Sequence, residues 1–395
     1  MFPKLRFKEF DGDLTESKLV ELTSWASGGT PAKDVPEYWG DDIPLISGAS
    51  MHTNQLYESD VKITKLGLQK GSKLAPKDSI LILVRGSMLF NKIPMGITLG
   101  DVAFNQDVKC IRPKQQLAPL FLFQWLHAKE NTIQNKVTAT GIGAGKLDTA
   151  DLQNLKLYKP SLEEQTKIAT FLSAVDEKIS QLTQKHALLS QYKQGMMQKL
   201  FSQQLRFKAD DGSEFREWEE KELKDIAEIN PKSKKLPESF IYIDLESVEK
   251  GQLLLQKNIE LQDAPSRAQR LLAKGDVLFQ MVRPYQQNNY YFNLSGEYVA
   301  STGYAQIRTK LDSKFIYYAL HEKTFLDEVM NRCTGTSYPA INSSDLSSIE
   351  ILIPCLEEQT KIANFLSAID QKIEVVAQQI EQAKTWKKGL LQQMF

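Results

Sequence analysis

The chain has 395 residues, enough for two to three domains of about 150 residues each. Its 49 basic residues balance its 49 acidic residues, which argues against non-specific coating of nucleic acid, because such binding depends on neutralising phosphates. A local basic surface is compatible with this balance. The longest apolar run, from Ser79 to Val84, is far shorter than the roughly 20 residues of a membrane span, and the charged N-terminal stretch lacks the apolar core of a signal peptide. We therefore expect a cytoplasmic protein that does not contact a membrane.

Residues 1–160 form the first predicted domain, and they mix helix and strand patterns. A short helix is predicted after Leu19 and Leu22, a buried strand at 79–84 and a longer helix at 120–131. This alternation of elements predicts a mixed α/β domain.

Residues 161–204 predict one long helix. Apolar side chains recur with a 4-3 spacing from Ile168 to Leu200, and His186 and Lys193 fill two of the apolar positions. A heptad pattern of this length is typical of a coiled coil rather than of a helix on the surface of a globular core. About 40 residues at 1.5 Å each would give a rod of roughly 60 Å. His186 is interpreted as a polar residue that sets the register of the coiled coil.

The start of this helix is repeated near the end of the chain. The segment "LEEQTKIATFLSAVDEKI" begins at Leu162, and "LEEQTKIANFLSAIDQKI" begins at Leu356, an offset of 194 residues with fifteen of eighteen positions identical. Ser161 is a candidate N-cap for the first copy, with Glu164 at the capping-box position. Residues 355–395 therefore predict a second helix of the same kind.

The repeat extends into residues 205–354, the second predicted domain. "LRFKEFDGD" at Leu5 resembles "LRFKADDGS" at Leu205, and the strand pattern at 77–85 resembles that at 275–283. In contrast, residues 28–55 share little with residues 230–252, which lie between the matched stretches. The pattern predicts that the two halves share one scaffold and carry two different sets of loops.

Chain order predicts how the two helices pair. The residues after the first helix resemble the residues at the N-terminus, so the second helix must run back to the first domain. The predicted fold class is therefore α+β, with two mixed α/β domains separated by two long antiparallel helices that form an intramolecular coiled coil. A pseudo-twofold axis relates the two halves, and the helices act as a ruler between them.

This organisation resembles the specificity (S) subunit of type I DNA restriction–modification enzymes. The resemblance covers the whole chain. It rests on the repeat at Leu162 and Leu356, on the "TG…DL…P" approach to each helix, and on "GGTP…YW…IPLISG" between residues 28 and 48. It implies that each domain is a target-recognition domain that reads one half of a bipartite site in double-stranded DNA. Half-sites one helical turn apart need about 34–36 Å, which a rod of this length can span.

The resemblance also implies the partners and the cofactors. The helices would set the spacer and bind two methyltransferase (modification) subunits, and restriction subunits with nuclease and translocase activity would join the larger complex. S-adenosylmethionine would be held by the methyltransferase partner, and ATP and Mg by the nuclease partner. No cofactor or metal is expected on this chain, and no catalytic residue.

Residue types that read base edges or contact phosphates occur in turn-rich stretches of both domains. Arg85 and Arg283 end matched strands, and the alternative interpretation for each is an arginine paired with an acidic neighbour. The "KSKK" run at 232–235 is a candidate for phosphate contact or a solvated charge run. The candidate DNA-binding residues are Thr30, Lys33, Ser47, Arg85, Ser87 and Asn91 in the first domain, and Lys232, Lys234, Lys235, Arg283, Tyr285, Gln286 and Gln287 in the second.

Two further repeated features have open interpretations. Thr140-Gly141 and Thr334-Gly335 recur in both halves, and we interpret them as structural turns, with base contact as the alternative. The identical helix starts predict a partner-binding surface on the exposed helix faces, although preservation of the coiled coil would also explain the identity. The candidate partner-binding residues are Glu163, Glu164, Gln165, Lys167, Glu357, Glu358, Gln359 and Lys361.

Enzymatic alternatives receive little support from the sequence. The chain has no [N/D]-P-P-[Y/F] motif of an amino-methyltransferase, and the glycine-rich stretch 140–146 precedes no β-α-β pattern. Acidic-x-Lys triplets at 60–62 and 107–109 are common in a charged chain. The four histidines are too scattered, and the three cysteines too far apart, to indicate a metal site or a catalytic triad. The alternative function that remains is a coiled-coil scaffold without a DNA-binding role.

Overall fold

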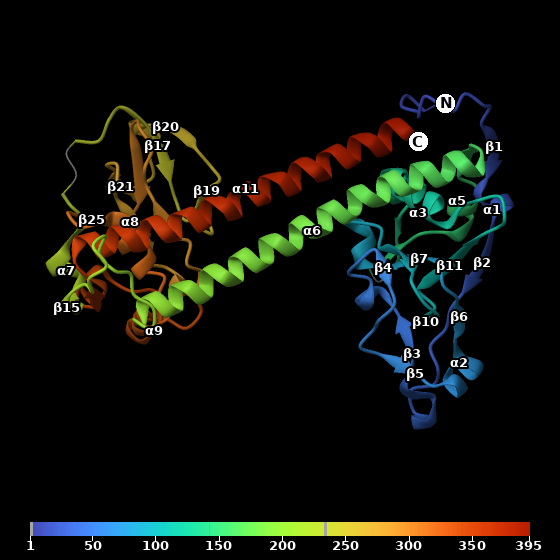
Figure 1. Ribbon diagram of the computed structural model, residues 1–395, viewed down its shortest axis with the longest axis horizontal. Helices are drawn as coiled ribbons and strands as arrows, with labels where there is room; N and C mark the ends of the chain where they lie inside the picture. The colour runs from blue at the N-terminus through green and yellow to red at the C-terminus, as the bar shows by residue number, and fades with distance from the viewer. Residues whose placement is uncertain (1–2, 142, 233–234) are drawn as a thin grey trace. The chain divides into compact units, whose positions relative to one another are not determined.

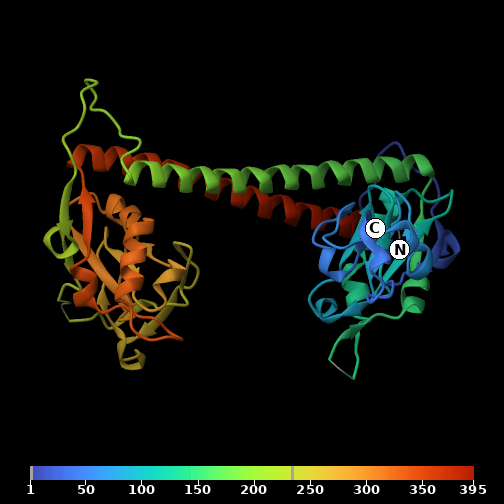
Figure 2. The same ribbon diagram turned by 90° about the horizontal axis from the view of Figure 1, so that it is seen from below.

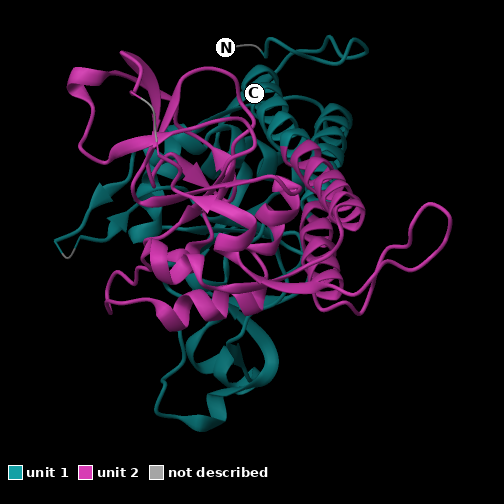
Figure 3. Ribbon diagram, turned by 90° about the vertical axis from the view of Figure 1, so that its left-hand side faces the viewer, with its two compact units in different colours: residues 1–183, 378–395 teal, residues 184–377 magenta. Residues whose placement is uncertain are grey.

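The structure is a computed structural model that describes residues 3–141, 143–232 and 235–395 (Figure 1). The chain divides into two compact units, which Figure 3 distinguishes by colour. Unit 1 contains residues 1–183 and 378–395, and unit 2 contains residues 184–377. Helices α6 (Leu162–Phe201) and α11 (Leu356–Met394) are each shared between the units. The predicted return of the second helix to the first domain is therefore confirmed, whereas the division into four segments at 160, 204 and 354 stays a prediction.

Unit 1 is built on two main sheets. The five-stranded sheet has the order β2-β11-β7-β9-β4, and the four-stranded sheet has the order β5-β3-β10-β6. Two smaller sheets pair β1 with β14 and place β13 between β12 and β8. The strands are β1 (Thr15–Lys18), β2 (Thr23–Ser27), β3 (Trp39–Ile46), β4 (Gln55–Leu56), β5 (Lys62–Ile63), β6 (Lys73–Ala75), β7 (Ile80–Leu83), β8 (Arg85–Gly86), β9 (Met95–Thr98), β10 (Val102–Phe104), β11 (Val108–Pro113), β12 (Thr138–Ala139), β13 (Gly145–Lys146) and β14 (Lys156–Lys159).

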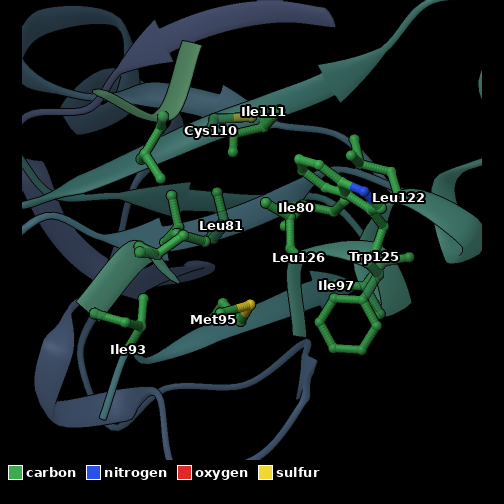
Figure 4. Close-up of a cluster of buried hydrophobic side chains, with 14 of the residues drawn as sticks. Ile80, Leu81, Ile93, Met95, Ile97, Cys110, Ile111, Leu122, Trp125 and Leu126 are labelled. Atoms are coloured by element: carbon green, nitrogen blue, oxygen red, sulfur yellow. The ribbon is translucent and has the colours of Figure 1, made fainter. Parts of the chain in front are cut away.

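The core of unit 1 lies between the five-stranded sheet and helix α3 (Pro119–Ala128). All four residues of β7 are buried, as the unbroken apolar run predicted. Figure 4 shows Leu122, Trp125 and Leu126 of α3 packed toward side chains of the sheet such as Ile80 and Ile97. Burying a side chain of this size contributes about 1.5–3 kcal/mol. The other helices are α1 (Leu19–Leu22), η1 (Pro36–Tyr38), η2 (Gly48–Ser50), α2 (Lys65–Gly71), η3 (Ser87–Phe90), α4 (Glu130–Gln134) and α5 (Thr149–Gln153).

Unit 2 repeats much of this topology, with a four-stranded sheet where unit 1 has the five-stranded one. One sheet has the order β16-β25-β22-β23, another has the order β20-β17-β24-β21, and two-stranded sheets pair β15 with β26 and β18 with β19. The strands are β15 (Glu219–Glu222), β16 (Ala227–Ile229), β17 (Ser239–Ile243), β18 (Val248–Glu249), β19 (Gln252–Leu253), β20 (Lys257–Glu260), β21 (Ala268–Leu271), β22 (Val277–Gln280), β23 (Tyr290–Tyr291), β24 (Tyr298–Ser301), β25 (Tyr304–Thr309) and β26 (Glu350–Ile353). The helices are α7 (Leu223–Ile226), η4 (Leu261–Asp263), η5 (Pro284–Gln286), α8 (Ser313–Ala319), α9 (Lys323–Arg332) and α10 (Ser343–Ser347).

The internal match includes the stretches whose sequences diverge. Strand β3 pairs with β10 in parallel and with β5 antiparallel. Strand β17 likewise pairs with β24 in parallel and with β20 antiparallel. The last strand of each of these two sheets pairs antiparallel with its neighbour, β6 with β10 and β21 with β24. The divergent sequences therefore fold on the same strand order, and the duplicated scaffold is confirmed.

The long helices pack against each other within each unit. In unit 1 the start of α6 packs on the end of α11 (Figure 2). Leu172 of α6 shares an apolar cluster there with Leu390 and Met394. In unit 2 the end of α6 packs on the start of α11, where Leu200 shares a cluster with Leu366. The antiparallel pairing is thus confirmed, and every predicted apolar position of the seam is buried or half-buried.

Lysines occupy two seam positions, and each has a partner across the seam. The Nζ of Lys387 lies 2.5 Å from Oδ1 of Asp176 in unit 1. In unit 2 the Nζ of Lys193 lies 2.6 Å from Oδ1 of Asp370. A charged pair at such a position favours one register over its neighbours. Within the described part of the chain, no helix combines the length and the apolar character that a membrane span requires.

Candidate nucleic-acid interface

Arg85 is the first residue of β8, which follows β7 in unit 1. Its backbone pairs with that of Lys146 in β13, and the 3-10 helix η3 follows directly. The side chain is exposed. Among the residues that the structure describes, no carboxylate forms an ion pair with Arg85, whereas Lys146 pairs with Asp148 at 3.0 Å. The alternative interpretation, a strand-end arginine neutralised by an acidic neighbour, therefore has no supporting contact within that part of the chain.

Two lysines extend the positive charge around Arg85. Burial lowers the pKa of Lys109, and the charges of Arg85 and Lys73 lower it further. Like charges depress a lysine pKa only at short range, so these three cations share one neighbourhood. We name Lys73, Arg85 and Lys109 the unit 1 basic cluster. Lys73 and Lys109 were missed in the sequence because they are far apart in the chain and only the fold brings them together.

The "GGTP" motif holds the next loop close to strand β10. A Cβ on Gly28 would lie 2.1 Å from the carbonyl oxygen of Phe104, and a Cβ on Gly29 would lie 2.4 Å from that of Gly71. Only glycine fits such a close backbone approach. The Oγ1 of Thr30 donates to Oε1 of Gln106 at 2.8 Å, which leaves the hydroxyl engaged within the protein.

The other predicted residues of unit 1 have mixed environments. Lys33, Ser87 and Asn91 are exposed, while Ser47 is half-buried. The backbone N–H of Ser47 donates to Oγ of Ser50 at 2.9 Å, so this serine belongs to a local turn. Ser87 opens η3 directly after Arg85 and Gly86, which places it beside the basic cluster along the chain. A DNA contact by any of these residues stays a prediction.

Arg283 occupies the place in unit 2 that Arg85 occupies in unit 1. It follows strand β22 and precedes η5, and its Cζ lies 4.3 Å from the centroid of the Tyr338 ring. Tyr338 is 63% exposed. Within the described ranges of the chain, Arg283 also has no acidic partner. Each of the two matched strands, β7 and β22, is thus followed by an arginine that forms no ion pair with a described residue.

A buried glutamine braces the loop that carries Arg283. The Nε2 of Gln280 donates to the carbonyl oxygen of Val282 and to Oε1 of Gln286, and its Oε1 accepts from the N–H of Asn288. Its own N–H donates to Oδ1 of Asn289 at 2.8 Å. Gln286 is therefore partly engaged within the protein, although its side chain is exposed.

The remaining candidates of unit 2 lie on both sides of this brace. Tyr285 is 51% exposed. Gln287 is half-buried, and its Nε2 donates to the carbonyl oxygen of His321 at 3.4 Å. Lys232 and Lys235 are exposed. Lys234 lies outside the described residues.

The repeated Thr-Gly pairs form turns beside the two arginines. In unit 1 the N–H and the carbonyl oxygen of Ala144 both bond to the hydroxyl of Thr140, within the β12–β13 turn next to Arg85. In unit 2 the backbones of Thr334 and Ala340 exchange two hydrogen bonds of 2.9 Å, and Ala340 also pairs with Val282. Both pairs thus lie in local turns, and base contact by either pair stays an open alternative.

The predicted partner surface is only partly exposed. Glu163 and Glu357 are exposed. The expected exposure is wrong for Glu164, Gln165, Glu358 and Gln359, which are at most 2% exposed. Lys167 and Lys361 form ion pairs with Glu9 and Asp210, so they too have partners within the protein.

The buried residues of the "LEEQ" motif hold each helix to its own globular region. In unit 1 the guanidinium of Arg6 donates to both carboxylate oxygens of Glu164, at 2.6 and 2.7 Å. Oε1 of Gln165 accepts from the N–H of Ala118, and its Nε2 donates to the carbonyl oxygen of Pro160.

Unit 2 repeats these contacts on the second copy of the motif. Arg206 and the indole N–H of Trp218 donate to Glu358. Gln359 accepts from the N–H of Asp312 and donates to the carbonyl oxygen of Pro354. One internal interface, built twice, thus explains why the buried residues of the two motifs are identical.

The predicted helix start is confirmed in part. The N–H of Glu164 donates to Oγ of Ser161 at 3.3 Å, as an N-cap requires. The Glu164 side chain bonds to Arg6 instead of closing a capping box. The repeats at Leu5 and Leu205 carried the signal for this pairing, because each copy places an arginine at its second position.

Comparison with known proteins assigns the family. The family model described as "Type I restriction modification DNA specificity domain" matches residues 12–191 and 216–385. The chain belongs to this family, and it has the organisation of a specificity subunit with two such domains.

The relatives agree with this assignment. The chain is 26% identical to the type I restriction enzyme MjaVIII specificity subunit of Methanocaldococcus jannaschii, over 98% of this chain and 94% of that protein. It is 29% identical to the EcoR124I/EcoR124II specificity subunit of Escherichia coli, over 46% of this chain and 45% of that protein. The fold is similar to the crystal structure of a type I restriction–modification S subunit from M. genitalium, with a TM-score of 0.63, 17% identity and coverage of 100% and 99%.

Proposed function

We propose that the two units of this specificity subunit read different halves of one bipartite DNA site. The observation that carries the proposal is the repeated placement of an arginine without an acidic partner in the described chain. Arg85 and Arg283 each follow a matched strand and each lie beside a Thr-Gly turn. The two units share their strand order but differ in the chemistry around these arginines, as two readers of different sequences require.

We propose that the long helices set the spacer between the two half-sites. Helices α6 and α11 have 40 and 39 residues. Their apolar seam and the two Lys–Asp pairs favour a single register. A heptad inserted at matched points of both helices should lengthen the DNA spacer that the protein accepts. An unchanged spacer, with the variant still folded, would contradict the ruler.

We propose that two methyltransferase subunits bind the exposed faces of the helices. Tyr192 on α6 in unit 2 and Trp386 on α11 in unit 1 occupy equivalent positions of the repeat and are 51% and 54% exposed. Aromatic side chains of this kind are enriched among the residues that dominate binding energy at protein interfaces. Glu163 and Glu357 are further candidates, because their side chains are exposed.

We propose that this chain performs no chemistry itself. In a complex of this kind, S-adenosylmethionine would be bound by the methyltransferase subunits, and ATP and Mg by restriction subunits. The described residues contain no group of three or more His, Cys, Asp or Glu side chains arranged to hold a metal ion. The role of the chain would be to bind and orient the DNA.

The experiment is single-molecule sequencing of methylated bases in a host that expresses the chain with its cognate methyltransferase subunit. The expected result is a bipartite methylated motif that disappears when this chain is omitted. A complex that forms and yields no motif would contradict the proposal and favour a coiled-coil scaffold without a DNA-binding role. A host expressing the methyltransferase subunit alone is the control.

A further inference from the structure

We propose that Arg283 reads a guanine in the half-site of unit 2 and that Tyr338 is its positioning residue. This inference rests on the proposed DNA-reading function. It adds the base that is read, the arginine that reads it and the side chain that positions this arginine. Neither the position of Tyr338 nor its role is evident from the repeat, because the equivalent residue in unit 1 is Ala144.

The backbone of Arg283 is held in an unusual conformation. Its φ angle is 55°, in the left-handed region, which costs a residue with a side chain about 1–2 kcal/mol. The N–H of Arg283 donates to the carbonyl oxygen of Pro339 at 2.7 Å, and its own carbonyl oxygen accepts from the N–H of Gln286 at 3.0 Å. Residues in such conformations persist where the surroundings hold them and gather at functional sites.

The side chain of Arg283 is directed by the Tyr338 ring. The guanidinium carbon lies 4.3 Å from the ring centroid, within the range of a cation–π contact. The ring restricts where the guanidinium lies without using its N–H donors. The described residues offer those donors no ion pair, and Tyr338 is largely exposed, so the group is available to a ligand.

These features fit a base edge better than a phosphate. A phosphate contact depends mainly on charge, and a mobile lysine or arginine can supply it. Guanine presents two acceptors, O6 and N7, in the major groove, and the planar fork of an arginine matches both at once. A ring that holds the guanidinium in place favours this directional contact. A contact that depends on charge alone would gain little from it.

The loop around Arg283 is held by hydrogen bonds within the protein. Gln280 is 2% exposed and bonds to residues 282, 286, 288 and 289. The Nδ2 of Asn289 lies 3.3 Å from Nε2 of His321, whose Nδ1 lies 2.7 Å from the carbonyl oxygen of Tyr317. A loop that is ordered before binding loses less conformational entropy when it meets DNA.

The experiment uses the complex of the full chain with its methyltransferase subunit. The methylated motif of the wild-type complex is sequenced first, and methylation rates are then measured on duplexes with each base of the unit 2 half-site replaced. The variants are Arg283→Lys, Tyr338→Ala and Tyr338→Phe. Leu255→Ala, at an exposed position of unit 2 outside this loop, is the matched control.

We expect a guanine in the unit 2 half-site whose discrimination falls about 5- to 150-fold in Arg283→Lys and Tyr338→Ala, which is the range for one bidentate base contact. Tyr338→Phe keeps the ring and should keep the discrimination, as should Leu255→Ala. The other half-site should be unchanged in all four variants. Unfolding temperatures measured in parallel identify any variant that fails through lost stability, and Arg283→Lys then carries the test.

Three results would overturn the inference. A wild-type unit 2 half-site without guanine would exclude the base. Equal weakening on all sequences, with a salt dependence reduced by about one phosphate contact, would make Arg283 a phosphate contact. Full discrimination in Tyr338→Ala would remove the positioning role. A wild-type complex with no methylated motif would instead contradict the proposed function, and this inference with it.

Discussion

Units 1 and 2 each place an arginine shortly after a matched strand, β7 or β22, and surround it differently. Arg85 is exposed and shares its neighbourhood with Lys73 and Lys109. Arg283 lies over an aromatic ring, and its loop is braced by Gln280. The strand order therefore fixes where a reading residue can lie, while a few neighbouring side chains set the exposure and the contacts of that residue.

The largest expected difference between the units concerns the buried glutamate of the "LEEQ" motif. Glu358 accepts from Arg206 and Trp218, whereas the side chain of Glu164 accepts from Arg6 within the described residues. Removing one member of a buried ion pair costs about 3–5 kcal/mol. Glu358→Ala should therefore lower the free energy of unfolding of unit 2 by that amount. Glu164→Ala should lower that of unit 1 by less, because only Glu358→Ala also leaves the buried indole N–H of Trp218 without its acceptor.

Chemical denaturation followed by hydrogen exchange would measure both losses. Glu357→Ala, at an exposed position of the same helix, should change stability by no more than about 0.5 kcal/mol. A loss from Glu164→Ala that equals or exceeds the loss from Glu358→Ala would contradict the contrast between the two sites.

The helix seam should instead respond symmetrically. Leu172 in unit 1 and Leu366 in unit 2 occupy equivalent positions of the repeat, and both are 0% exposed. Replacing a buried leucine by alanine costs about 2–5 kcal/mol, depending on how far the cavity collapses. Leu172→Ala should weaken hydrogen-exchange protection mainly in unit 1, and Leu366→Ala mainly in unit 2. Loss of protection in both units from either variant would show that the units do not unfold separately.

The exposed aromatic residues should contribute equally to partner binding. Tyr192→Ala and Trp386→Ala should each weaken one methyltransferase site by about 2 kcal/mol, a typical value for an interface residue of this type. Calorimetric titration of the methyltransferase subunit would then show one weakened and one intact site. Tyr192→Phe, which keeps the ring, is the control. Two intact sites in either alanine variant would place the partner elsewhere on the chain.

Substitutions within the unit 1 basic cluster should separate base reading from phosphate contact. Arg85→Ala should reduce discrimination at one position of the unit 1 half-site by about 1–3 kcal/mol. Lys73→Ala should weaken binding to all sequences alike and lower the slope of affinity against salt by about one phosphate contact. Affinities measured at several salt concentrations on matched and mismatched duplexes would test both. Sequence-independent weakening by Arg85→Ala would remove its reading role.

The seam, the repeat and the position of the two arginines after matched strands were predictable because each shows in a repeated or periodic pattern. Heptad spacing predicts one buried stripe on a helix, and the structure buries that stripe. The burial of Glu164 and Gln165 was not predictable in the same way. Their helix carries a second buried face, which exists only because Arg6 and Ala118 fold onto it from distant parts of the chain.

The surroundings of the arginines show the same limit. Tyr338 follows Arg283 by 55 residues in the chain, and Lys109 follows Lys73 by 36. Such contacts depend on which strands and turns become neighbours, and a single sequence carries no periodic signal for them. The repeat predicted that the two halves share a scaffold, while the differences that matter for reading arise from residues outside the matched motifs.

The central claim is that each unit reads its own half of one site. The most direct test replaces residues 28–55 in unit 1 by the corresponding segment of another family member and sequences the methylated motif of the resulting complex. If each unit reads its own half-site, the motif should change in one half-site only, with the other half-site and the spacer unchanged. A change in both half-sites, or an unchanged motif from a complex that still methylates DNA, would contradict it.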